Sequence, residues 1–166
     1  MDVQDHCTLF TFNRWANERT RRAVESLPEE ALYTDLKNSF GSIHGTLLHL
    51  CGAEDIWLQR LTGADPGIFM KKEAYPTYAA VREKWLAVEQ GWAEFIGTLS
   101  GEMLQKELVF HNLKGEKVSQ LIGQSLQHLV NHSTYHRGQI TTMVRQSGGT
   151  PVGTDLIVFY REQHKA

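Results

Sequence analysis

The chain is poor in the features that mark several large protein classes. Its two cysteines, Cys7 and Cys51, are too few for a disulfide scaffold and suit a reducing compartment. Lysine and arginine number 17 against 19 for aspartate and glutamate, with no basic block, which disfavours contact with DNA or RNA. No apolar run approaches the roughly 20 residues that span a bilayer, and residues 1–7 lack a signal-peptide pattern. We therefore expect a cytoplasmic protein with neither nucleic acid nor a membrane as its partner.

Length and hydrophobic patterning predict one all-α domain over residues 1–166. A chain of this length can bury a core without disulfides. Apolar spacing and helix-ending residues predict four long helices, at about residues 3–26, 42–61, 77–99 and 119–146. A small hairpin is predicted at 107–118, before the last long helix, with its turn at 112–115, and a short final helix within 151–166. Long helices joined by such connections favour a four-helix bundle.

Three of the eight histidines lie four residues apart in the last long helix: His128, His132 and His136. A rise of about 1.5 Å per residue puts neighbours roughly 6 Å apart on adjacent turns, the spacing of the H-x-x-x-H pattern in metalloprotease helices. The glutamate of H-E-x-x-H is missing, because Ser133 stands in its place, so a protease of that kind is disfavoured. On a helical wheel His136 lies within the apolar face, His132 at its shoulder and His128 toward the rim. Two inward imidazoles are costly to bury without partners, and a shared metal ion would satisfy both.

A metal site in a bundle needs further ligands from a facing helix. The second predicted helix offers His44 and His49, and its wheel does not decide between them. Small residues around His49, Gly45 and Gly52 among them, would let another helix approach closely, which weakly favours His49. The same helix carries three alternative ligands: Cys51, Glu54 and Asp55.

The segments 45–63 and 128–140, the tail 149–156 and the early stretch 12–17 together resemble the DinB/YfiT family of metal-dependent proteins. The most specific part is His-Arg-Gly-Gln at residues 136–139 with a histidine upstream. This family is not the translesion polymerase that shares the DinB name. The resemblance implies an up-down-down-up four-helix bundle, often a homodimer, with a metal site of three histidines. Its ligands fall here on His49, His132 and His136, whereas His128 matches a family residue that is usually not a ligand.

Other side chains near these histidines have predicted supporting roles. The candidates to orient a ligand imidazole through a hydrogen bond are Glu54, Gln139 and His128. For Glu54 we favour an exposed or capping position over that role, whereas Gln139 points close to the site on the wheel. Arg137 points away from it and is expected to make an interhelical contact. Three tryptophans at helical spacing are expected in the core or in an interface: Trp57, Trp85 and Trp92.

Three neutral imidazoles would leave a position on a divalent metal open to water or substrate. Imidazole suits zinc, nickel, copper or iron, of which we favour zinc or nickel. The family includes bacillithiol S-transferases and a mycothiol-dependent maleylpyruvate isomerase. The first hypothesis is therefore an enzyme that activates a low-molecular-weight thiol for attack on a small electrophilic substrate. Hydrolysis by a metal-bound water competes with it, and a non-enzymatic, stress-induced metal-binding or dimeric interaction protein is the second hypothesis.

Overall fold

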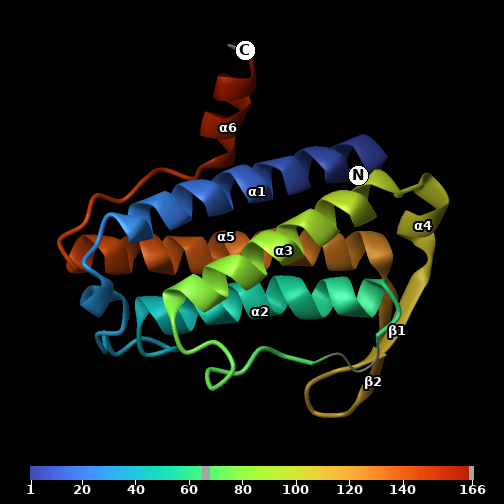
Figure 1. Ribbon diagram of the computed structural model, residues 1–166. Helices are drawn as coiled ribbons and strands as arrows, with labels where there is room; N and C mark the ends of the chain where they lie inside the picture. Colours follow the sequence, from blue (N-terminus) through green and yellow to red (C-terminus); the bar gives the residue numbers. More distant parts are fainter. Residues whose placement is uncertain (65–67, 165–166) are drawn as a thin grey trace.

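Four long helices form a bundle in the computed structural model, which describes residues 1–64 and 68–164 (Figure 1). The helices are α1 (Val3–Glu25), α2 (Ile43–Leu61), α3 (Tyr78–Gly97) and α5 (Ile122–Gln146). Helices α1 and α5 run in one direction and α2 and α3 in the other, which confirms the up-down-down-up arrangement. Helix α5 packs against α1 and α2, and α3 packs against the same two helices. The α2–α5 pair and the α1–α3 pair therefore lie on opposite sides of the bundle.

The helix starts are set by side chains that satisfy the first backbone amides. The Asp2 and Asp5 side chains cap α1 reciprocally. Ser42 accepts a hydrogen bond from the Gly45 amide, and Thr77 accepts one from the Ala80 amide. Such side-chain caps are a local signal, and the predicted starts of the second and third helices are confirmed.

The predicted start of the last long helix at residue 119 is wrong. Strands β1 (Glu107–His111) and β2 (Lys117–Leu121) pair antiparallel, so residues 119–121 belong to the hairpin. Strand pairing satisfies their backbone groups across the hairpin, and the helix can begin only at Ile122, whose amide donates to the Lys106 carbonyl. The hairpin itself and its turn are confirmed, and Gly115 takes the left-handed conformation with φ 80°.

Three short helices complete the described chain: η1 (Glu29–Leu32), α4 (Gly101–Gln105) and α6 (Leu156–Gln163). Helix α6 is the predicted final helix, and it stands away from the bundle in Figure 1. Its inner residue Phe159 packs against Phe12 and Trp15 of α1. The long helices end slightly earlier than predicted, α1 at Glu25 and α3 at Gly97.

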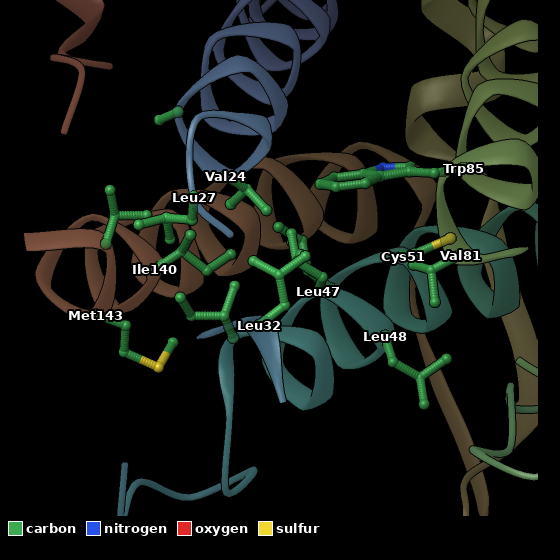
Figure 2. Packing of buried hydrophobic residues seen from close by; sticks show 14 of the residues in the cluster. Val24, Leu27, Leu32, Leu47, Leu48, Cys51, Val81, Trp85, Ile140 and Met143 are labelled. Atoms are coloured by element: carbon green, nitrogen blue, oxygen red, sulfur yellow. The ribbon is translucent and has the colours of Figure 1, made fainter. Parts of the chain in front are cut away.

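The core takes apolar residues from all four long helices. Figure 2 shows Val24 of α1, Leu47 of α2, Trp85 of α3 and Ile140 of α5 meeting in one cluster. Trp85 and Trp92 are buried, as expected of core aromatics. Burial of each large apolar side chain contributes roughly 1.5–3 kcal/mol, so the bundle has a core that does not depend on a metal. Within the described part of the chain, no helix is long and apolar enough to cross a membrane.

Candidate metal centre

Three histidine rings from α2 and α5 meet where these antiparallel helices face each other. Nε2 of His132 lies 3.2 Å from Nε2 of His49 and 3.1 Å from Nε2 of His136. One ring nitrogen from each residue lies within 4.8 Å of the others, so this group could hold a metal ion. We call these three residues the histidine trio. His132 and His136 converge because four residues bring them to one face of α5.

Hydrogen bonding among the rings cannot satisfy all three nitrogens. An Nε2 atom carries either one proton or one lone pair, yet Nε2 of His132 faces two other ring nitrogens. Nitrogens bound at about 2.0–2.1 Å to a tetrahedral zinc ion lie roughly 3.3 Å apart. The observed separations of 3.1 and 3.2 Å are close to that value. The donor set and its spacing therefore fit a single divalent cation shared by the trio.

The surroundings of His49 and His132 favour neutral imidazoles, the form that binds metal. Burial, and then the positive charge that His136 would carry, lower the pKa of His49 to about 4. Burial and the three neighbouring histidines lower the pKa of His132 to about 3. Protons therefore compete weakly with a cation at these two residues near neutral pH.

Gln139 orients the His136 ring. Its Oε1 atom lies 2.8 Å from Nδ1 of His136. An amide oxygen only accepts hydrogen bonds, so Nδ1 carries a proton, and in the neutral ring Nε2 has its lone pair toward the trio. Such a partner behind a ligand fixes the ring and its tautomer. For His132, by contrast, Nδ1 is buried and has no hydrogen-bond partner among the described residues.

Two phenylalanines from loops cover the outer side of His49. Phe40 stacks on the His49 ring, with centroids 4.0 Å apart and planes at 18°, and Phe69 lies 5.9 Å from it. Glycines of α2 make room for both: a Cβ at Gly45 would lie 2.1 Å from the Phe40 carbonyl oxygen, and one at Gly52 would lie 3.0 Å from the Phe69 ring. The small residues around His49 thus admit two loops, not the helix that the sequence suggested. In the sequence, Gly45 and Gly52 indicated that other atoms pack closely against this part of the helix. They did not identify Phe40 and Phe69 as the residues that do so.

The other histidine candidates lie outside the trio. His128 is exposed, and its ring contacts Trp57 and His132 at centroid distances of 5.6 and 5.8 Å. His44 is buried and packs on Tyr33, 5.0 Å away. The remaining alternative ligands are also engaged elsewhere: Cys51 lies in the core, where burial raises the pKa of its thiol, and Asp55 forms an ion pair with Lys84 at 2.8 Å.

Glu54 is neither exposed nor a cap, which corrects the preferred prediction. Its side chain is 1% exposed and accepts hydrogen bonds from three other helices. The donors are Asn13 (2.8 Å) and Asn17 (3.0 Å) of α1, Trp85 (2.7 Å) of α3 and Ser133 (3.0 Å) of α5. The carboxylate is stable there because these donors replace water. None of its described contacts is to a trio ring, so Glu54 positions α5 through Ser133, the neighbour of His132.

Arg137 makes the predicted interhelical contact. It is fully buried, and its guanidinium donates to Asn13 (2.6 Å) and Asn17 (2.8 Å) of α1. Burial lowers the pKa of Arg137 to about 10, so the group stays charged at neutral pH. The two asparagines thus bridge a buried cation and the buried carboxylate of Glu54, which joins α1, α2 and α5 behind the trio.

Comparisons with known proteins agree with the fold. The protein named Protein DinB from Bacillus subtilis (strain 168) is 29% identical over 167 residues, which cover 95% of this chain and 96% of that one. A crystal structure of a DinB-like protein from Bacillus cereus ATCC 10987 superposes with a TM-score of 0.64 at 18% identity, covering 92% of this chain and 97% of the other, and so supports the fold. The model of the DinB family matches residues 1–165. The chain belongs to the DinB family.

Proposed function

We propose that the histidine trio binds one divalent metal ion, zinc or nickel, and that the protein is an enzyme that activates a low-molecular-weight thiol. The observation that supports this most directly is the convergence of three ring nitrogens, two of them 3.1 and 3.2 Å from the third. A site of three neutral imidazoles leaves at least one position on the cation for an exogenous group. Among the described residues, no further histidine, cysteine, aspartate or glutamate joins the three.

Each residue near the trio has a definite task in this proposal. His49, His132 and His136 would hold the cation, and Gln139 orients the His136 ring through Nδ1 so that Nε2 faces the other two rings. Phe40 restrains the His49 ring and keeps water from one side of it. When bound, the metal would lower the pKa of a thiol and hold it as the thiolate. In the transfer, a bond forms between the sulfur and an electrophilic carbon, the leaving group departs with its electron pair, and the thiol proton passes to it or to water.

The test compares two reactions with the same protein. Wild type loaded with zinc or nickel, chelated wild type and His136→Ala are assayed with glutathione or cysteine and 1-chloro-2,4-dinitrobenzene, and separately with ester and amide panels. We expect thiol conjugation faster than the uncatalysed reaction with the loaded wild type alone. Ester or amide hydrolysis without conjugation would replace the proposal with a metal-water hydrolase. Tight metal binding with neither reaction would favour the non-enzymatic hypothesis.

A further inference from the structure

A pocket lies between α1 and α3, on the side of the bundle that faces away from the histidine trio. Its volume is about 200 Å³. Helix α1 contributes Phe10 to the lining, α3 contributes Glu89 and Trp92, and the buried Glu54 of α2 closes the pocket from within. An apolar cavity of about 150 Å³ is enough to hold benzene, so this pocket has room for one aromatic ring. We call it the α1–α3 pocket.

The walls of the α1–α3 pocket are aromatic and aliphatic. The ring centroids of Phe10 and Trp92 lie 4.8 Å apart, and Ile96 lines the pocket one turn beyond Trp92 on α3. The indole N–H of Trp92 donates to the backbone carbonyl of Glu54 at 3.0 Å, so its polar edge is satisfied within the protein. Trp92 therefore presents an apolar surface to the pocket. Such walls favour a ligand with a flat apolar body.

The charges around the inner end of the pocket cancel. Arg21 donates two hydrogen bonds to the Glu89 carboxylate, at 2.7 and 3.0 Å. Glu54 is linked to the buried Arg137 through the asparagines of α1. Arg14 also lines the pocket and is exposed, so it lies at the mouth. A bound cation would meet Arg14 and add a buried positive charge, and a bound anion would meet two carboxylates. These charges favour a neutral molecule.

Glu89 has capacity for a further hydrogen bond. Its side chain is 9% exposed, and it accepts hydrogen bonds from Arg21 and Asn17. A carboxylate has about four acceptor positions, so these donors leave at least one of them. Burial raises the pKa of Glu89 despite the hydrogen bonds and the charge of Arg21, so its donors compensate only in part for the lost water. An O–H or N–H group on a molecule in the pocket adds the donor that this carboxylate lacks.

We propose that the α1–α3 pocket binds a small neutral molecule with one aromatic ring and one O–H or N–H donor. The ring lies against Phe10 and Trp92, and the donor reaches the Glu89 carboxylate. This site lies apart from the trio and goes beyond the proposed function. It requires neither a bound metal nor the thiol chemistry, so each can fail without the other.

Cys7 provides a direct reporter of occupancy, because it lines the α1–α3 pocket. The other cysteine, Cys51, is 0% exposed in the core, and burial raises the pKa of its thiol. In the folded protein, iodoacetamide should therefore label Cys7 and spare Cys51. A molecule bound in the pocket should slow that labelling, whereas a molecule bound elsewhere on the surface should not.

The experiment uses metal-free full-length protein and four probes of similar size: phenol, toluene, benzoate and benzylamine. Titration calorimetry gives the Kd of each probe, and mass spectrometry follows the labelling of Cys7. Ala93→Phe places a ring at the mouth of the pocket. Ala79→Phe makes the same change at another exposed position of α3, about 21 Å along the helix and outside the pocket. Circular dichroism checks that both variants are folded.

We expect phenol to bind more tightly than the other three probes, although a purely apolar pocket would prefer toluene. Labelling of Cys7 should fall by about half at a phenol concentration equal to the Kd. Ala93→Phe should weaken phenol binding about tenfold or more, and Ala79→Phe should leave it unchanged.

Three results would overturn the proposal: no binding of phenol, binding that leaves the labelling rate of Cys7 unchanged, or equal weakening by the two variants. Tighter binding of toluene than of phenol would overturn the assignment of a donor. Tighter binding of benzoate or benzylamine would overturn the assignment of a neutral ligand.

Discussion

Glu54 is the residue at which the buried polar contacts of the bundle converge. Its carboxylate accepts hydrogen bonds from α1, α3 and α5, and its backbone carbonyl accepts one from Trp92 at 3.0 Å. A buried carboxylate with this many donors fixes the rotation of each helix that supplies one. Because Ser133 is one of them, Glu54 determines how α5 presents His132 and His136 to α2.

Replacing the carboxylate of Glu54 should therefore destabilise the fold. Glu54→Gln puts an NH₂ group among donors from Asn13, Asn17 and Trp85, and leaves the buried charge of Arg137 without its counter-charge. We expect the free energy of unfolding to fall by roughly 2–4 kcal/mol. Urea denaturation measures this, with Glu83→Gln on the exposed face of α3 as the control that should change little. A Glu54→Gln variant as stable as the control would contradict the role given to Glu54.

The position of Glu54 could not be predicted from the sequence, although that of Arg137 could. The wheel of α5 placed Arg137 away from the trio side, which is a local property of one helix. The burial of Glu54 depends on donors 31 to 79 residues away in the chain, on three other helices. No spacing within α2 indicates them, and an isolated acid in a helix is most often solvated.

The loop that precedes α2 packs most closely against the helix at Gly45. Phe40 reaches the His49 ring only because its carbonyl oxygen passes over Gly45, where a Cβ would lie 2.1 Å away. A backbone oxygen at this distance cannot move aside for an added methyl group, as the end of a flexible side chain could. The same loop is held by the Asn38 side chain, which accepts from the Phe40 amide at 2.8 Å.

Gly45→Ala should consequently separate this loop from the trio. We expect the variant to lose about 1–3 kcal/mol of unfolding free energy, the cost of inserting a methyl group into a packed contact, and to bind zinc more weakly because His49 loses its stacked partner. Urea unfolding and zinc titration against a chelator measure the two effects. Gly97→Ala is the matched control, because a Cβ there meets no described atom within 4 Å. Equal behaviour of the two variants would show that the loop does not hold His49.

The starts of α2 and α3 were predictable from the sequence because Ser42 and Thr77 cap helices through contacts three residues away. The start of α5 was not, since residues 119–121 follow the helical pattern but pair with β1 across the hairpin. Helix propensity is a weak signal where a strand partner competes. The periodicity of the last long helix predicted that His132 and His136 share one face. The choice of His49 depended on how α2 packs against α5, and only the family resemblance supplied that information.

At the scale of the whole molecule, the histidine trio lies between α2 and α5, apart from the residues of the apolar core. Trp85 and Trp92 fill that core within one chain, and Trp57 packs on Phe110. The tryptophans therefore do not by themselves require a second subunit, and the homodimer stays a prediction from family resemblance. Since the core does not include the trio, loss of metal should lower stability without unfolding the bundle.

The metal content of two histidine variants tests the central claim most directly. His136→Ala and His128→Ala remove the same ring from α5, but only His136 has its Nε2 atom in the trio. After loading with zinc and removal of excess, elemental analysis should find about one ion per chain in wild type and in His128→Ala, and almost none in His136→Ala, with all three folded by circular dichroism. Loss of metal from His128→Ala together with its retention in His132→Ala would contradict the geometry of the site.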